Sequence, residues 1–270
     1  MPDLAVAGRR FAWRAEGVGP PVMLAHCSLA HSGLWKPVIA ALCEDFQLMA
    51  PDMPAHGHSD PPPEGVSLQR HAVAGCRAIA EAAVAPVHLV GLSLGGAVLG
   101  RLALEAPQLV ASLTLIEPVW FHLLRDADPS AFAANEATMV AVLPAIARGD
   151  FHAGARAFME AWGMQGKFDS MDAKGRDYVA QCLTHLARDF EMVTGSPPGQ
   201  VTLGDLPRLR MPVMLVSGAT TQPPATAVCD VIHRQLPAAR REVMAGAGHL
   251  APVTHPAETA ALLRDFWGRP

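Results

Sequence analysis

The segment from Val87 to Leu99 constrains the fold of this chain more than any other. An apolar run of strand length, Val87 to Val90, leads directly into Gly-Leu-Ser-Leu-Gly and then into residues typical of a helix. A direct passage from strand to helix imposes tight backbone angles on the residue at the turn, Ser93, and leaves little room beside it. Gly91 and Gly95 suit these positions because they lack a Cβ atom. The sequence therefore predicts a sharp turn with the Ser93 hydroxyl directed outward.

Short apolar runs recur along the chain, and each is followed by a helical pattern. Strands that are apolar on both sides and alternate with helices are typical of a mostly parallel sheet with helices on both faces. The alternation breaks once, between Pro118 and about Pro207, where apolar residues recur at helical spacing. We therefore predict an α/β fold with a core of residues 1–118 and 207–270 and an inserted helical cap, residues 119–206.

The individual elements follow from the same pattern. The expected strands are Val22–His26, Phe46–Pro51, Val87–Val90, Leu113–Ile116, Val213–Ser217 and Glu242–Ala245. The expected helices are Leu34–Cys43, Leu68–Val84, Ala97–Ala106, Ala225–Leu236 and Pro256–Phe266. Because proline is favoured in the first turn of a helix, Pro37 indicates that the first of these helices starts near it.

Composition and charge exclude several classes of protein. With 270 residues, of which 50% are hydrophobic, the chain can bury a large core as one sizeable domain. A formal net charge of -4 without a basic run argues against a nucleic-acid partner. We expect neither a membrane span nor a signal peptide, hence a cytoplasmic protein with no membrane partner. The cysteines have neither disulfide nor zinc spacing and suggest reduced thiols: Cys27, Cys43, Cys76, Cys182 and Cys229.

His249 is the histidine best placed to act with Ser93. A serine hydroxyl is a poor nucleophile until a base accepts its proton. His249 follows the last apolar run, in the loop Gly246–Leu250 just before the final helix. Both residues are thus expected at the carboxyl ends of parallel strands, the edge at which open α/β sheets bind ligands. The sequence predicts that the two side chains meet there.

Four motifs together resemble the α/β-hydrolase family with a helical cap, over nearly the whole chain. They are Leu24–Ser28, Asp52–Ser59, the turn at Ser93 and Gly248–His249. The resemblance implies an oxyanion hole formed by the backbone N–H groups of Ser28 and Leu94. It also implies a loop-stabilising role for His26. Cys27 and Ala55 stand where relatives usually carry glycine.

The third member of the expected triad departs from the family pattern. Relatives commonly carry aspartate in a G-x-x-D motif, whereas this chain has Gly218-Ala219-Thr220-Thr221. Either the triad is broken or the acid comes from another strand, because threonine cannot stabilise an imidazolium as a carboxylate does. Glu117 ends the strand beside the Ser93 strand, a position from which certain haloalkane dehalogenases take their acid. We therefore predict Glu117 as the acid, Asp52 as a loop-bracing residue, and little effect of Thr221→Ala.

The resemblance implies hydrolysis of a small or medium, mainly apolar carboxylic ester through an acyl-enzyme. Such chemistry requires no metal and no organic cofactor, and its partner is a small-molecule substrate. The apolar side chains directly after Glu117, among them Trp120, Phe121 and Leu124, are expected near the rim of the pocket. A carbon–carbon bond hydrolase, a lactonase, an amidase and a cofactor-free haloperoxidase stay open on the same residues. So does a non-catalytic small-molecule receptor. The sequence does not define an oligomeric state.

Overall fold

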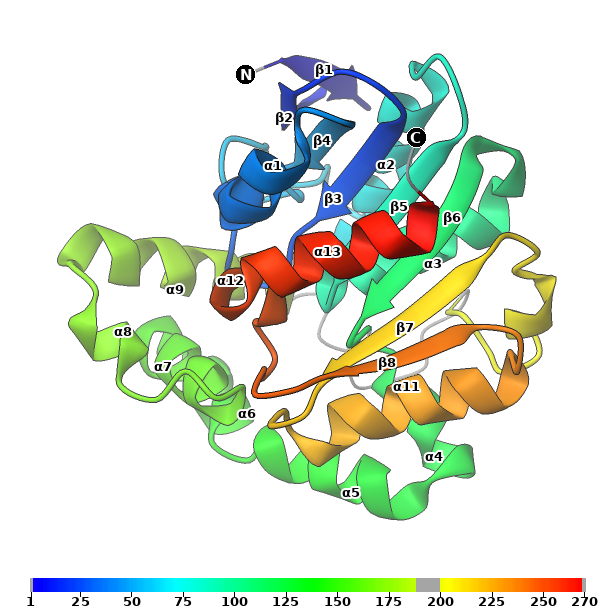
Figure 1. Ribbon diagram of the computed structural model, residues 1–270. Coiled ribbons are helices and arrows are strands. Elements are labelled where there is room, and N and C mark those ends of the chain that lie inside the picture. The colour runs from blue at the N-terminus through cyan, green and yellow to red at the C-terminus, as the bar shows by residue number, and fades with distance from the viewer. Residues whose placement is uncertain (1, 188–199, 269–270) are drawn as a thin grey trace.

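A twisted sheet lies at the centre of the computed structural model, which describes residues 2–187 and 200–268 (Figure 1). The described residues form eight strands in the order β1-β2-β4-β3-β5-β6-β7-β8. The strands from β4 to β8 in this order are parallel, whereas β2 runs antiparallel to both β4 and β1. The predicted fold class is therefore confirmed. The strands are β1 (Asp3–Val6), β2 (Arg9–Glu16), β3 (Pro21–Ala25), β4 (Gln47–Pro51), β5 (Val87–Leu92), β6 (Val110–Ile116), β7 (Val213–Gly218) and β8 (Arg240–Met244).

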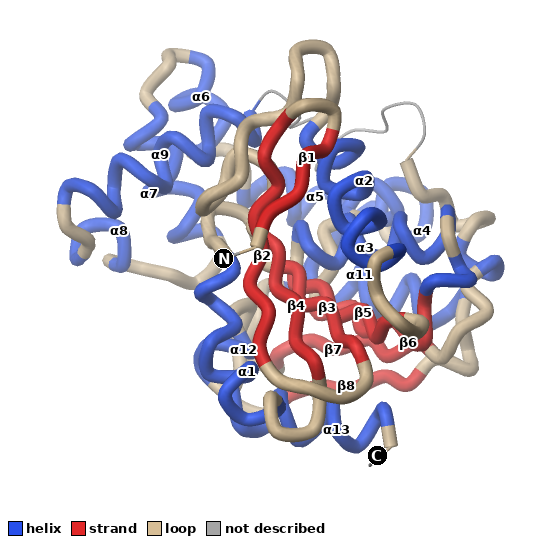
Figure 2. The backbone as a smooth tube through the Cα atoms, turned by 90° about the horizontal axis from the view of Figure 1, so that it is seen from above, coloured by secondary structure: helices blue, strands red, loops and turns tan. Residues whose placement is uncertain are grey.

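Helices cover both faces of this sheet. Seen from above, α1 and α13 lie on one side of the strands, and α2, α3 and α11 lie on the other (Figure 2). Alternate residues of β5 face the two layers, with Leu89 in the core beside α3 and Val90 in the core beside α1. The core helices are α1 (Lys36–Leu42), α2 (Leu68–Glu81), α3 (Leu94–Glu105), α11 (Pro223–Gln235), α12 (Ala251–Thr254) and α13 (Pro256–Trp267), with 3-10 turns η1 (Ser32–Trp35) and η2 (Pro107–Leu109).

The strands β1 and β2, at one end of the sheet, were not expected from the sequence. In β2 only Phe11 and Ala12 are buried, and its remaining residues are partly or fully exposed. A strand with one short buried stretch carries too weak a period-two pattern to be recognised.

A long helical segment connects β6 to β7, and we call residues 119–206 the insertion. Within it, α6 to α9 extend beyond the carboxyl ends of the strands, whereas α4 and α5 pack beside α11 (Figure 1). Its described helices are η3 (Phe121–Leu123), α4 (Leu124–Ala127), α5 (Pro129–Thr138), α6 (Val142–Ala147), α7 (Phe151–Ala161), α8 (Lys167–Ser170), α9 (Ala173–Ala187) and η4 (Leu206–Arg208).

The insertion is tied to the core by hydrogen bonds from α9. The Tyr178 hydroxyl donates to the Ala30 carbonyl at 2.7 Å and accepts from the Gly57 N–H at 3.0 Å. The Cys182 thiol donates to the Ala55 carbonyl at 3.6 Å. These contacts fix α9 to the two loops that follow β3 and β4.

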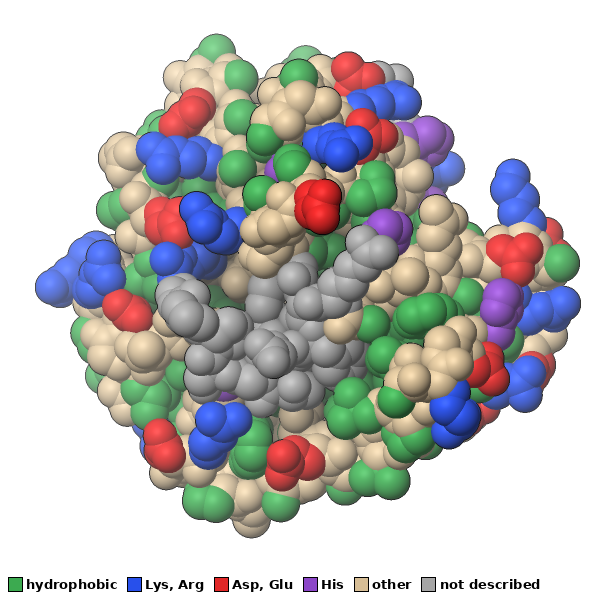
Figure 3. All heavy atoms as spheres, turned by 180° about the vertical axis from the view of Figure 1, so that it is seen from behind, with side chains coloured by type: hydrophobic (Ala, Val, Ile, Leu, Met, Phe, Trp, Pro, Cys, Tyr) green, Lys and Arg blue, Asp and Glu red, His purple; other side chains and the backbone are tan. Residues whose placement is uncertain are grey.

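The surface, the described helices and the cysteines add three observations. The face opposite that of Figure 1 mixes Lys and Arg with Asp and Glu side chains, so neither sign of charge dominates it (Figure 3). Across residues 2–187 and 200–268, no helix combines the length and the apolar character needed to cross a membrane. All five cysteines are free.

Candidate active site

The carboxyl ends of β3 and β5 define the point where the strand order reverses. The chain passes from β3 to β4 on one side, then returns to β5 on the other side of β3. In parallel α/β sheets the crevice above such a reversal is the usual ligand site. Ser28 lies shortly after the end of β3, and Ser93 directly follows β5, so both belong to this crevice.

Ser93 occupies the sharp turn that the sequence predicts. It lies between β5 and α3 with φ 56° and ψ -114°, a conformation that side-chain-bearing residues rarely adopt. The backbone around Gly91 and Gly95 is packed too closely for a residue that carries a Cβ atom. A Cβ atom on Gly91 would lie 2.4 Å from the Gly95 carbonyl oxygen, and one on Gly95 would lie 2.3 Å from the Ala25 carbonyl oxygen. Glycine at both positions is thus a steric requirement of the turn.

His249 and Glu117 form a buried hydrogen-bonded pair. The Nδ1 atom of His249 lies 2.5 Å from Oε2 of Glu117, and the two side chains are 6% and 0% exposed. Glu117 directly follows β6 and has a left-handed backbone with φ 46°. With Nδ1–H donated to the carboxylate, Nε2 is the ring nitrogen that keeps a free lone pair. The pair therefore orients the imidazole as a proton acceptor.

Thr221 takes part in this arrangement, contrary to the expectation of a neutral position. Its hydroxyl donates to Oε2 of Glu117 at 2.8 Å, the same oxygen that contacts His249. The Gly218 N–H donates to Oε1 at 2.7 Å. The end of β7 thus lacks the usual acid and instead supplies two donors that hold the carboxylate of the neighbouring strand. A buried carboxylate requires such donors to offset its lost hydration.

The other acidic candidates have different partners. Asp52 accepts from the Ser32 N–H at 2.7 Å and from the His58 N–H at 2.9 Å, so it braces the loops after β3 and β4. Asp230 forms an ion pair with Arg241 at 3.0 Å. Their hydrogen bonds therefore hold other parts of the chain, and among the described contacts it is Glu117 that reaches His249.

His26 and Cys27 contribute to the loop after β3. His26 donates from Nδ1 to the Cys27 carbonyl and accepts at Nε2 from the Met53 N–H, both at 2.8 Å. Through these bonds His26 links the loops after β3 and β4, which agrees with the loop-stabilising role expected of it. Burial raises the pKa of the Cys27 thiol to about 12, so its nucleophilic thiolate is scarce near neutral pH.

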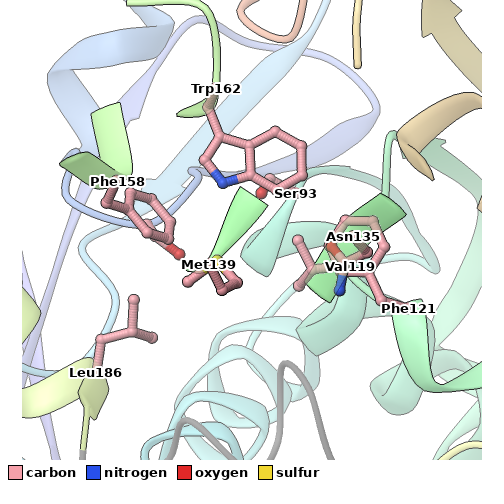
Figure 4. Close-up of a pocket in the computed structure, with 9 residues that line it drawn as sticks. Ser93, Val119, Phe121, Asn135, Met139, Phe158, Trp162 and Leu186 are labelled. Atoms are coloured by element: carbon pink, nitrogen blue, oxygen red, sulfur yellow. The ribbon is translucent and has the colours of Figure 1, made fainter. Parts of the chain in front are cut away.

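A small cavity adjoins Ser93 beneath the insertion (Figure 4). Of the three predicted pocket residues, Phe121 lines it. Trp120 and Leu124 do not: Trp120 packs its indole against Gly100 in the core, and Leu124 is fully buried at the start of α4. The residues that line the cavity are Ser28, Ser93, Val119, Phe121, Asn135, Met139, Phe158, Trp162 and Leu186. The contributions of α5, α7 and α9 were missed because the sequence does not show which side of an inserted helix faces the core.

Trp162 closes this cavity on the side of His249. Its ring centroid lies 4.6 Å from that of His249 and 5.6 Å from that of Phe121, with which it is stacked. The cavity has a volume of about 10 Å³, roughly the space of one water molecule. Trp162 also lines a larger groove of about 290 Å³, together with His249 and Thr221. Trp162 thus forms a wall between the small cavity at Ser93 and the larger groove beside His249.

Both residues expected to supply oxyanion donors lie at this site. Leu94 is the first residue of α3, where a backbone N–H has no partner within the helix. Ser28 lines the cavity together with Ser93. In the part of the chain that the structure describes, no cluster of three or more His, Cys, Asp or Glu residues is arranged to hold a metal ion.

Comparison with known proteins identifies the family. A sequence model described as the alpha/beta hydrolase family matches residues 22–262. Among curated proteins, the pimeloyl-(acyl-carrier protein) methyl ester esterase of Nitrosomonas europaea is 26% identical over 253 residues, covering 89% of this chain and 92% of that protein. Uncharacterized proteins of Mycobacterium tuberculosis and Mycobacterium bovis are 37% identical over 111 residues, but this match covers only 33% of their length.

Solved structures give the same fold. An alpha/beta hydrolase from Sphaerobacter thermophilus is similar with a TM-score of 0.75 at 18% identity, over 99% of this chain and 100% of that one. An N-acyl homoserine lactone degrading enzyme is similar with a TM-score of 0.74 at 21% identity, over 98% and 100%. The family match spans most of the chain and agrees with the order of the strands. The chain therefore belongs to the alpha/beta hydrolase family.

Proposed function

We propose that this protein is a serine hydrolase that cleaves carboxylic esters, with Ser93 as nucleophile, His249 as base and Glu117 as acid. The observation that carries the proposal is the 2.5 Å contact between His249 Nδ1 and Glu117, on the same sheet edge as the strained Ser93 turn. A base oriented by a carboxylate, at the same site as a serine hydroxyl, is the arrangement that activates serine.

In the first half-reaction, Nε2 of His249 accepts the Ser93 hydroxyl proton as Oγ forms a bond to the ester carbonyl carbon. The Glu117 carboxylate stabilises the imidazolium that results. The negative charge on the former carbonyl oxygen is stabilised by the N–H groups of Ser28 and Leu94. Such donors contribute about 3 kcal/mol each to the transition state. The bond to the alkoxide then breaks, and the alkoxide leaves as an alcohol with the proton of His249.

In the second half-reaction, water takes the place of the alcohol. His249 accepts a proton from the water molecule as the water oxygen attacks the acyl carbon of the Ser93 ester. The bond to Oγ breaks, Ser93 regains its proton from His249, and the carboxylic acid leaves. All proton transfers use one base, and no other reactant is needed.

The lining of the cavity supports an ester whose acyl part is mainly apolar. Phe121, Met139, Phe158 and Leu186 offer hydrocarbon surface beside Ser93. The Nitrosomonas europaea relative is named as a methyl ester esterase, which supports ester cleavage over the other reactions of this fold. Lactones and carbon–carbon bond substrates are compatible with the same residues and belong in the substrate screen.

A fluorophosphonate probe tests the nucleophile directly. We expect one molecule of probe to add per protein, seen as a mass increase of the intact chain, and to be absent from Ser93→Ala. Ser93→Ala should fold normally because the strain of the turn lies in the backbone, yet lose nearly all ester hydrolysis.

Cys27→Ala is the matched control for the probe. Cys27 is a nucleophilic side chain in the loop after β3, near Ser93, and its replacement should leave the labelling intact. Ser93→Ala protein that keeps wild-type turnover, or a wild-type protein that fails to label, would contradict the proposed function.

A further inference from the structure

Asn135 is the one buried residue of α5. The alanines and Phe132 of this helix are exposed or only partly buried, whereas Asn135 is only 2% exposed. Helices normally direct apolar residues toward the core, since an amide loses its hydration there. A polar residue at the buried position of a helix therefore requires a partner.

Within the described part of the chain, the amide nitrogen of Asn135 has no hydrogen-bond partner. Its Nδ2 atom is buried without a hydrogen-bond partner, although the backbone carbonyl of the same residue accepts from Thr138 at 2.7 Å. Most buried side-chain donors in native proteins are paired, so an unpaired one calls for an explanation. A group supplied by a bound molecule would satisfy it.

The surroundings of Asn135 point to the chemistry of that group. Asn135 lines the same cavity as Ser93, among apolar side chains such as Val119 and Phe121 (Figure 4). The indole nitrogen of Trp162, which lines the cavity as well, is likewise buried without a partner among the described residues. Two of the residues that line this cavity with Ser93 thus carry an unpaired N–H donor, one from α5 and one from the end of α7.

We propose that Asn135 is a specificity-determining residue that donates to an oxygen atom within the acyl chain of the substrate, with Trp162 as a second donor. This inference rests on the proposed ester hydrolysis and narrows its substrate class to oxygenated acyl esters, those with a keto, ether or hydroxyl oxygen. If a plain alkyl chain were bound, the N–H donors of Asn135 and Trp162 would both stay buried without a hydrogen-bond partner. A carboxylate is not matched either, because the described residues that line the cavity include no Lys or Arg.

The test compares matched methyl esters: hexanoate and its 3-oxo, 4-oxo and 5-oxo analogues. Each enzymatic kcat/KM is divided by the rate constant for hydroxide-catalysed hydrolysis of the same ester, so that electronic activation by the keto group cancels. Wild-type protein should prefer one oxo ester over hexanoate by about tenfold or more, the effect of one well-placed hydrogen bond to a buried group.

Asn135→Leu keeps the branched shape of the side chain and removes the donor. We expect this variant to lose the corrected preference for the oxo ester while it hydrolyses hexanoate at least as well as wild type. Trp162→Phe keeps a stacked ring without the N–H and should lose part of the preference. Met139→Leu is the matched control, since Met139 lines the same cavity one helical turn later and offers no donor. It should change all four rates by the same factor.

Thermal unfolding separates substrate recognition from a structural role. If the amide is unpaired in the free protein, Asn135→Leu should raise the Tm, by about 2–4 °C. A Tm that falls by several degrees would mean that the amide stabilises the fold, and would overturn the inference.

Binding without turnover separates this inference from the proposed function. In Ser93→Ala protein, the preferred oxo ester should raise the Tm more than hexanoate does, and this difference should disappear in the double variant with Asn135→Leu. Wild-type protein that hydrolyses all four esters at equal corrected rates would refute the role of Asn135 and leave the hydrolase intact. If no ester is cleaved and no probe adds, the proposed function fails, and the Tm differences still decide whether Asn135 binds the oxygenated chain.

Discussion

The carboxylate of Glu117 accepts hydrogen bonds from three residues that belong to different parts of the chain. Gly218 and Thr221 donate from the end of β7 and the turn after it, and His249 donates from the loop after β8. These three donors hold the carboxylate in one position and one orientation. Substitution of Glu117 therefore tests how the His249 imidazole is oriented.

Glu117→Gln should lower kcat by about 10²- to 10⁴-fold. The amide keeps the shape of the side chain but removes the charge that stabilises the imidazolium of His249. Steady-state kinetics on an ester that the wild type cleaves would measure the loss. Full activity in this variant, together with an inactive Asp52→Asn or Asp230→Asn, would assign the acid to another residue.

Thr221 provides the matched comparison. Thr221→Ala removes one of the donors to the carboxylate, so we expect a stability loss of about 1–3 kcal/mol and a smaller effect on kcat than that of Glu117→Gln. Thr220→Ala is the control, because Thr220 donates to the Ala247 carbonyl instead. In Glu117→Gln, a second change of Thr221→Asp should recover part of the activity, since position 221 already contacts the carboxylate that orients His249.

How far the sequence predicts this site depends on the residue. Ser93 and His249 stand in short motifs next to strand ends, and Glu117 follows a strand directly, so their positions can be derived from local patterns. Asn135 and Trp162 belong to inserted helices whose orientation depends on tertiary packing, and no local pattern directs them to Ser93. The sequence does not reveal the hydrogen bond from the Thr221 hydroxyl to Glu117. The G-x-x-D pattern shows which residue the threonine replaces, but not which neighbour its side chain contacts.

At the level of elements, two buried histidines brace the loops that follow β3 and β4. His56 donates from Nδ1 to the Pro54 carbonyl at 2.9 Å and accepts at Nε2 from the Leu29 N–H at 3.2 Å. His26 links the same two loops through Met53. Burial lowers the pKa of His56 to about 4 and that of His26 to about 3. Both rings are therefore neutral in the folded protein at neutral pH.

These loops should make the stability depend on pH. In the unfolded chain a histidine binds a proton near pH 6.5, whereas folded His56 binds one only near pH 4. Between these values the unfolded state holds more protons, so the free energy of unfolding decreases as the pH falls from about 6.5 to 4. His56 alone should account for a loss on the order of 3 kcal/mol.

His56→Gln tests this origin of the pH dependence. The glutamine oxygen can replace Nε2 as an acceptor but does not titrate. Denaturant unfolding at several pH values should show a flatter dependence in this variant than in wild type. His152→Gln, a change at an exposed histidine on α7, is the control. An unchanged slope in His56→Gln would show that His56 does not cause the acid sensitivity.

The cavity beside Ser93 has a volume of about 10 Å³, and side chains of the insertion line most of it. Trp162→Ala removes the wall between this cavity and the groove beside His249. We expect kcat/KM for esters with long acyl chains to increase by about tenfold relative to that for acetate esters, while the Tm falls. Phe158→Ala enlarges the same cavity from α7 but does not open that wall, so its effect on chain-length preference should be smaller. Equal changes in both variants would indicate that cavity volume alone matters.

For the whole molecule, the sequence establishes the alternation of strands and helices but not the strands β1 and β2 or the packing of the insertion. Strongly apolar runs such as Val87–Val90 identify the central strands, because these are buried on both sides. The strands β1 and β2 carry little buried surface, and the pairing of β2 with β4 depends on contacts distant in sequence. The site could be predicted because parallel strands bring their carboxyl ends to one edge. The cap boundaries and the cytoplasmic location stay predictions.

The anchoring of Glu117 shows which part of the molecule positions the base. Glu117 is the second residue before the insertion, and Pro118 alone separates the two. Its N–H donates to the Val216 carbonyl at 3.0 Å, and its carboxylate is held by Gly218 and Thr221. The residue next to the insertion is therefore fixed to the adjacent strand at both its main chain and its side chain. It follows that β7 and the turn after it, rather than the inserted helices, hold the carboxylate that orients His249.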